Sequence, residues 1–145
     1  MAGVVRSPGH DTRRSWTVYI TGALKPDQCI GIVTLRPSDN RSNDDSATEG
    51  RWQLGYLFRP QYWGNGYATE SCLAAIESLR KDVEGISHQD RAILVAYVDP
   101  GNDQSIHVLK KLGFGVIAHR KFDGPDRYLA GQWRPAENLV LKRDL

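Results

Sequence analysis

Long apolar runs are missing from this sequence of 145 residues. No stretch approaches the roughly 20 apolar residues that cross a bilayer, and the first residues lack the apolar core of a signal peptide. We therefore expect no membrane partner and a cytoplasmic location, with the nucleus as the alternative.

The sequence also has few cysteines and almost no excess of charge of one sign. The two cysteines, Cys29 and Cys72, fall in different predicted elements without C-x-x-C spacing, which predicts free, buried thiols in a reducing compartment and no metal site. The net charge of +2 comes from 19 basic and 17 acidic residues scattered along the chain. Because they form no basic stripe, we expect no nucleic-acid partner.

What is present is a glycine-rich turn, Q-Y-W-G-N-G-Y-A-T-E, over residues 61–70. It lies between a predicted strand (51–58) and a predicted helix (69–80). Gly64 and Gly66 can adopt backbone angles closed to other residues, and the start of a helix offers unpaired N–H groups and a partial positive charge. The turn therefore predicts a diphosphate site, and a purely structural turn is the alternative.

Two common phosphate-binding motifs fit this turn poorly. The dinucleotide fingerprint G-x-G-x-x-G requires a third glycine where Thr69 stands. The nucleotide-triphosphate loop requires a lysine directly after its second glycine, but the first lysine after Gly66 is Lys81. Neither motif explains the turn.

A third pattern, Q-x-x-G-x-G, is formed by Gln61, Gly64 and Gly66. It resembles the acetyl-CoA pyrophosphate loop of the GNAT superfamily of N-acetyltransferases. A second block, V-D-P-G-N-D-Q-S at 98–105 with V-L-K-K-L-G-F at 108–114, is similar to a strand, Asn-x-x-Ser turn and short helix of the same superfamily. Together the blocks look most like the branch that contains the ribosomal-protein N-terminal acetyltransferases. The resemblance covers about residues 16–145.

The order of the predicted elements indicates an α/β (α+β) fold. Strands are predicted at 15–21, 28–35, 51–58, 92–98, 116–122 and 138–142, and helices at 69–80 and just after residue 102. This order favours a mixed sheet with helices on its faces, and the resemblance implies a GNAT-like, mostly antiparallel sheet. Residues 36–50 are interpreted as an exposed loop.

The N-terminal part departs from the family pattern. We interpret residues 1–14 as a loose arm in front of a single domain over residues 15–145. Members of the family usually begin with a further strand and two helices, which we therefore expect to be missing. A homodimer or larger assembly is then expected to cover the exposed sheet edge.

The resemblance implies direct transfer of an acetyl group from acetyl-CoA to a primary amine, either a protein N-terminal α-amine or a small-molecule amine. A backbone N–H near Leu57 is expected to polarise the thioester carbonyl. The residues expected to bind the coenzyme lie on the third strand, in the glycine turn and in the second block: Leu57, Phe58, Arg59, Gln61, Tyr62, Trp63, Gly64, Asn65, Gly66, Tyr67, Ala68, Thr69, Asn102 and Ser105.

Catalytic candidates are Asn102, Ser105 and Glu49. Many relatives carry a tyrosine acid seven residues after the asparagine, where this chain has Leu109. Ser105, or a water held by Asn102, is the substitute, although helix capping explains both residues equally well.

The identity of the base is equally open. Gln53 stands where some relatives carry a glutamate, and Glu49 is the nearest carboxylate, with a solvated loop residue as its alternative role. A weak base favours an acceptor amine of low pKa, such as an α-amine. The competing hypothesis is an acyl-CoA-binding module without turnover.

Overall fold

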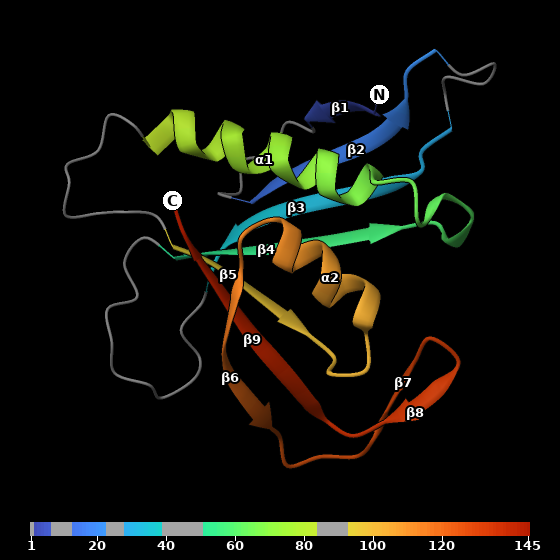
Figure 1. Cartoon of the computed structure of the whole chain (residues 1–145), viewed down its shortest axis with the longest axis vertical. Helices are drawn as coiled ribbons and strands as arrows, with labels where there is room; N and C mark the ends of the chain where they lie inside the picture. Colours follow the sequence, from blue (N-terminus) through green and yellow to red (C-terminus); the bar gives the residue numbers. More distant parts are fainter. Residues whose placement is uncertain (1, 7–12, 23–27, 39–50, 84–92) are drawn as a thin grey trace.

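A seven-stranded sheet in the order β1-β2-β3-β4-β5-β9-β6 runs through the molecule (Figure 1). The structure is a computed structural model and describes residues 2–6, 13–22, 28–38, 51–83 and 93–145. Its elements in chain order are β1 (Ala2–Arg6), β2 (Arg14–Ile20), β3 (Gly31–Pro37), β4 (Arg51–Phe58), the 3₁₀ helix η1 (Pro60–Tyr62), α1 (Tyr67–Val83), β5 (Ile93–Val98), α2 (Asp103–Lys111), β6 (Gly115–Lys121), β7 (Arg127–Leu129), β8 (Gln132–Arg134) and β9 (Glu137–Asp144).

The central strands β4 and β5 form the parallel pair of an otherwise antiparallel sheet. Their pairing ends at Gln53 and Val95, although β4 continues to Phe58 beside β3 and β5 continues to Val98 beside β9. Beyond Gln53 the two strands therefore diverge, as Figure 1 shows. Among the described residues, the part of β4 beyond Gln53 has no strand partner on the side of β5.

Helix α1 packs on one face of the sheet. Its apolar residues Cys72, Ala75, Ile76 and Leu79 recur at steps of three and four and are buried, as expected for an amphipathic helix. They pack against alternate residues of the strands below, namely Val18, Val33, Leu35, Leu54 and Phe58. Helix α2 packs against β5 and α1.

The other face of β3 and β4 remains accessible in the part of the chain that the structure describes. Successive residues of a strand point to opposite faces, so Ile32 and Leu57 point away from α1. Their side chains are 43% and 74% exposed. A ligand can therefore approach β4 from this face.

The N-terminal segment shows that the predicted loose arm was wrong over residues 2–6. These residues form β1, which pairs with β2 from Ala2↔Ile20 to Arg6↔Trp16. Val4 and Val5 are β-branched and favour a strand, and the pairing covers an edge of β2. The expected absence of a strand before the hairpin was wrong as well. Residues 7–12 lie outside the described residues, and the described residues before β2 contain no helix.

The connection between β6 and β9 contains a hairpin, β7–β8, that the sequence analysis missed. Its turn residues Ala130 and Gly131 have φ of 49° and 81°, and a tight hairpin turn of this kind needs two positive φ angles. Tyr128 and Trp133 stack edge to face across the hairpin, with ring centroids 5.4 Å apart. The connection between the last two predicted strands, to which no element was assigned, therefore has its own ordered structure.

The cysteine prediction is half right. Cys72 is buried and Cys29 is only half-buried, and both are free thiols. Burial raises the pKa of Cys72 to about 12, so its unreactive thiol form predominates at neutral pH.

Two further findings concern the described residues alone. They contain no group of three or more His, Cys, Asp or Glu side chains that could hold a metal ion. Their helices are too short or too polar to cross a membrane.

Candidate functional site

A tight turn joins the end of β4 to the start of α1 and carries the two glycines of the predicted anion site. The indole Nε1 of Trp63 donates a hydrogen bond to the Phe58 carbonyl at 2.8 Å. The side-chain amide Nδ2 of Asn65 donates to the carbonyls of Tyr62 and Trp63 at 3.2 and 3.1 Å. These bonds fix the path of the turn, so the side chains of Trp63 and Asn65 have a structural role here.

Gly64 and Gly66 have the backbone angles that the sequence predicted. Their φ angles are 77° and 81°, in the region that L-residues with a side chain avoid. A Cβ built on either glycine would meet no atom within 4 Å. The two glycines are exposed to open space, so a ligand can approach their backbone where a side chain would otherwise stand.

The first turn of α1 has hydrogen-bond donors directly after these glycines. The first bond of the helix runs from the Glu70 N–H to the Gly66 carbonyl at 3.0 Å. The N–H groups of Tyr67, Ala68 and Thr69 therefore have no acceptor within the helix. They point out of its positive end, and the residues present fit a diphosphate of acetyl-CoA. We call residues 64–69 the cradle.

The unpaired edge of β4 leads directly to the cradle. The Arg59 N–H donates to the Ile30 carbonyl of β3 at 2.9 Å, and hydrogen-bonded pairs alternate along an antiparallel ladder. In the observed register, the backbone of Leu57 therefore faces β3, whereas the backbone groups of Tyr56 and Phe58 face the gap between β4 and β5, beyond their last paired residues Gln53 and Val95. A backbone donor in the gap would thus come from a neighbour of Leu57, and its oxyanion role stays a prediction.

Tyr56 crosses from β4 to α2 and was not identified from the sequence. Its hydroxyl donates to the Ser105 carbonyl at 3.1 Å. Because α2 follows β5, this bond fixes the distance between two elements on either side of the gap. Sequence alone gave no signal for this contact, since the two residues are 49 positions apart.

The ionisation of Tyr56 gives a pH-dependent prediction. Burial raises the pKa of Tyr56 from 10.0 to about 12, so the folded state favours the protonated hydroxyl. Its contribution to stability is complete below pH 10 and is lost as the pH rises through about 12. We expect the free energy of unfolding, measured with urea, to fall more steeply between these pH values in the wild type than in Tyr56→Phe. Parallel profiles would contradict this assignment.

Asn102 and Ser105 lie at the start of α2. The side-chain Oδ1 of Asn102 accepts a hydrogen bond from the Ser105 N–H at 3.1 Å, so Asn102 is the N-cap of α2. This capping role was one of the two roles expected for the pair. Their catalytic role stays a prediction.

A second contact fixes the junction between β5 and α2. Asp99 Oδ1 accepts hydrogen bonds from the Gly101 N–H at 2.8 Å and from Arg134 Nε at 3.0 Å. The ion pair with Arg134 attaches the β7–β8 hairpin next to the start of α2. The hairpin therefore lies near the end of β5 that has diverged from β4.

The remaining predicted site residues gather around the turn. Arg59 directly precedes η1 and Gln61 lies in it, and both are exposed. Tyr62 is half-buried, and Phe58 is buried in the core under α1. Glu49 lies outside the described residues. The residues predicted to bind the coenzyme thus lie in two places, the turn with the β4 edge and the start of α2.

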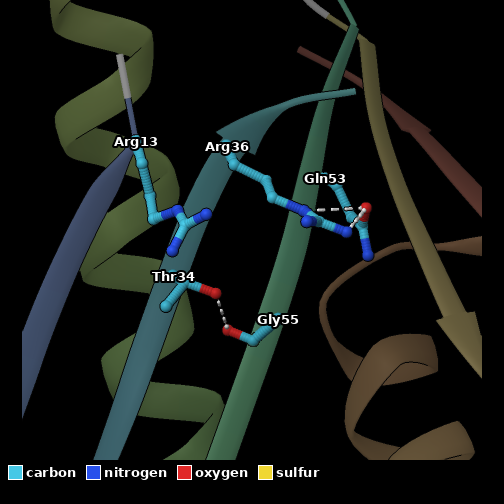
Figure 2. Close-up of a pocket in the computed structure, with 5 residues that line it drawn as sticks. All are labelled: Arg13, Thr34, Arg36, Gln53 and Gly55. Carbon is cyan, nitrogen blue, oxygen red and sulfur yellow. Dashed lines mark hydrogen bonds between the residues drawn. The ribbon is translucent and has the colours of Figure 1, made fainter. Parts of the chain in front are cut away.

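A hollow on the sheet face opposite α1 was also missed. It has a volume of about 270 Å³ and is lined by Arg13, Thr34, Arg36, Gln53 and Gly55. Figure 2 shows these residues on β3 and β4, together with Arg13, which directly precedes β2. Alternating residues of β3 and β4 face this side, which is the only sequence signal that could have grouped them.

Comparison with known proteins agrees with this geometry. The family described as Acetyltransferase (GNAT) domain matches residues 4–115. The uncharacterized protein YkkB of Bacillus subtilis (strain 168) is 36% identical over 61 residues, which are 42% of this chain and 32% of that protein. Ribosomal-protein-S5-alanine acetyltransferase from Vibrio fischeri has a TM-score of 0.65 at 19% identity, covering 92% of this chain and 62% of that chain. An acetyltransferase from Bacillus subtilis in complex with CoA has a TM-score of 0.64 at 15% identity, covering 92% and 78%.

These similarities differ in what they establish. The chain spans 32% of the length of YkkB and 62% of the Vibrio fischeri protein. At 19% identity or less, the similarity to these two solved structures shows the fold alone. The family match is longer and includes the cradle, the open edge of β4 and α2. On this evidence the chain belongs to the GNAT acetyltransferase family.

Proposed function

We propose that this chain transfers an acetyl group from acetyl-CoA to a primary amine by direct attack of the amine nitrogen on the thioester carbonyl. The observation that carries the proposal is the unpaired edge of β4, which ends at a cradle of two positive-φ glycines and a helix start. The solved Bacillus subtilis acetyltransferase that shares this fold is itself a complex with CoA.

Binding is divided between the cradle and the strand edge. The N–H groups of residues 66–69 bind the diphosphate. The backbone groups of Tyr56 and Phe58 that face the gap pair with the amides of the extended pantetheine arm, as in strand addition. The Phe58 carbonyl already accepts the indole N–H of Trp63 at 2.8 Å, so the N–H of Phe58 and both backbone groups of Tyr56 are the main partners.

The reaction needs a polarised carbonyl, a neutral amine and a proton for the leaving thiolate. A bond forms between the amine nitrogen and the acetyl carbon while the carbon–sulfur bond breaks and sulfur takes the electron pair. A backbone N–H of β4 in the gap stabilises the developing oxyanion. The nitrogen loses one proton to solvent as the amide forms. Ser105, or a water held by Asn102, passes a proton to the sulfur and is reprotonated from solvent, so that CoA leaves as the free thiol. Tyr56 is a positioning residue that holds Ser105 beside the gap.

Gln53 supports the expectation of a weak base. Its side-chain Oε1 accepts hydrogen bonds from Arg36 Nε at 3.1 Å and Nη2 at 2.7 Å, and an amide does not take up a proton at neutral pH. An α-amino group is already about one-tenth neutral at pH 7. The site therefore favours an acceptor amine that ionises near neutral pH.

The cradle, together with Gln53 in place of a carboxylate, also supports a second candidate function. A chain with the cradle but without a strong base would bind acyl-CoA and turn it over slowly or not at all. Calorimetric titration with CoA and a thiol-release assay with acetyl-CoA and a panel of amines and peptides separate the two. We expect saturable binding and thiol release that depends on an acceptor. CoA binding without thiol release for any acceptor would show that the chain is an acyl-CoA-binding module. Absence of CoA binding would exclude both functions.

We also propose a homodimer through the β6 edge of the sheet. β6 pairs with β9 and stands last in the strand order, and Val116 and Ile117 on it are exposed. Edge strands with apolar side chains favour pairing with another chain. Light scattering during gel filtration is expected to give twice the 16.3 kDa mass of the chain, and a monomer at high concentration would contradict the proposal.

A further inference from the structure

The turn that joins β5 to α2 is held by the side chain of Asp99. Its Oδ1 accepts hydrogen bonds from the Gly101 N–H at 2.8 Å and from Arg134 Nε at 3.0 Å. The backbone of the turn closes through a bond from the Asn102 N–H to the Asp99 carbonyl at 2.9 Å. The side chain of Asp99 is only 11% exposed, so water and salt screen its attraction to Arg134 less than in a surface pair. Arg134 therefore helps to fix the turn that ends at Asn102.

Gly101 is explained by Arg134 rather than by its own backbone angles. It is not among the glycines with positive φ, so its φ gives no reason for a glycine at this position. A Cβ built on Gly101 would instead overlap the guanidinium of Arg134. The missing side chain therefore lets the guanidinium lie directly against the backbone of the turn. A shielded carboxylate and a residue without a side chain thus accommodate the same arginine.

The hairpin that carries Arg134 is attached to a second strand. Arg127 pairs with Arg134 across β7 and β8. The Nη2 of Arg127 donates to the Glu137 carbonyl at 2.6 Å and to Asn138 Oδ1 at 3.1 Å. One arginine of this cross-strand pair therefore attaches the hairpin to β9, and the other attaches it to the β5–α2 turn. Arg134 holds the turn from a base that is itself fixed.

The turn leads into the two residues proposed for proton transfer to the sulfur. Asn102 Oδ1 accepts the Ser105 N–H at 3.1 Å, and the Ser105 carbonyl accepts the Tyr56 hydroxyl from β4 at 3.1 Å. The start of α2 is thus held from β4 by Tyr56 and from the hairpin by Arg134. A displacement of about 1 Å in a reacting group can slow a reaction about 100-fold, so the second attachment bears on the rate.

We propose that Arg134 is a positioning residue for the reaction, which acts through Asp99 and keeps the start of α2 within reach of the leaving sulfur. This inference rests on the proposed acetyl transfer and adds to it a residue outside the coenzyme site. Arg134 supplies no proton and takes part in no bond change. Its effect is on the placement of Asn102 and Ser105.

The test compares Arg134→Gln with the wild type in two assays. Glutamine removes the charge that pairs with Asp99. We expect kcat for thiol release from acetyl-CoA with an acceptor amine to fall about 10- to 100-fold, while the affinity for CoA in calorimetric titration changes less than about 2-fold. An unchanged kcat would overturn the inference and leave acetyl transfer standing. A parallel loss of CoA affinity would indicate a merely structural role and would also overturn it.

Arg127→Gln is the matched control. It removes the arginine opposite Arg134 in the same hairpin, and it leaves the contact with Asp99 in place. Its kcat is expected to equal that of the wild type. An equal loss of kcat in both variants would assign the effect to the hairpin as a whole and would overturn the specific role of Arg134.

Asp99→Asn tests whether the arginine acts through this carboxylate. Asparagine keeps an oxygen for the Gly101 N–H but has no charge for Arg134. Residues that act through one contact are coupled, so the double variant of Asp99→Asn and Arg134→Gln is expected to be no slower than the slower single variant. Losses that multiply in the double variant would overturn the proposed route.

Hydrogen exchange at the Ser105 N–H decides the inference if no amine is acetylated. This amide donates to Asn102 Oδ1, so its protection reports whether the start of α2 is held. NMR is expected to show exchange about 10-fold faster in Arg134→Gln and unchanged in Arg127→Gln. Unchanged protection of Ser105 in Arg134→Gln would overturn the inference independently of turnover.

Discussion

Replacing Gly66 with valine is expected to weaken CoA binding about 100-fold. The Gly66 backbone has φ of 81° and an open space where a Cβ would stand, and in the proposed complex the diphosphate occupies that space. A valine side chain there displaces the ligand from at least two N–H donors. At about 1.5 kcal/mol for each charge-assisted hydrogen bond, the loss is about 3 kcal/mol. Calorimetric titration with CoA measures it.

Gly131→Val is the matched control for this change. Gly131 also has φ of 81° and no atom within 4 Å of a built Cβ, but it lies in the turn of the β7–β8 hairpin. Both substitutions should cost about 1–2 kcal/mol of folding stability, because valine in the left-handed region is strained. Only Gly66→Val should lose affinity for CoA. Equal affinities for CoA in the two variants would contradict the placement of the diphosphate in the cradle.

Replacing Leu79 with alanine is expected to lower the free energy of unfolding by about 2–5 kcal/mol. Leu79 is 0% exposed and packs in the core between α1 and the sheet. Truncation removes apolar contacts and leaves a cavity that close-packed neighbours fill only partly. Because α1 begins at the cradle, the same packing holds the diphosphate donors in place. Urea denaturation followed by circular dichroism measures the change.

Leu73→Ala controls for helix propensity in the same element. Leu73 also lies in α1, but its side chain is 45% exposed. Alanine is at least as good a helix former as leucine, so the change should stay within about 0.5 kcal/mol. A similar loss in both variants would mean that the helix is not anchored through its buried face.

The elements near the site were predictable because their signals are local. The apolar spacing in α1 and the turn chemistry around Gly64 and Gly66 depend on residues close together in the chain. The strand over 51–58 was placed with the bounds that β4 has. The family resemblance and the fold class are confirmed by the family match and the sheet topology.

The features that sequence missed depend on contacts between distant segments. Val4 and Val5 form a strand because they pair with the edge of β2. The sequence around Gly3 has no alternation of apolar and polar residues that would have predicted this strand. The β7–β8 hairpin depends on Ala130 with a positive φ, which is uncommon for a residue with a side chain.

The residues that line the hollow could be grouped only once the pairing register of three strands was known. Arg13, Arg36 and Gln53 come from three segments, and only the pairing of β2 with β3 and of β3 with β4 brings them together. The assignment of Asn102 and Ser105 to catalysis is not decided by their position, because capping uses the same side chain.

The central claim is that the coenzyme lies along β4 with its diphosphate on the first N–H groups of α1. A crystal structure of the chain with CoA tests this most directly. We expect diphosphate oxygens within hydrogen-bonding distance of the N–H groups of residues 66–69, and the pantetheine arm beside Tyr56 and Phe58 in the gap between β4 and β5. A diphosphate bound elsewhere, or a gap closed by protein atoms in the complex, would contradict the account.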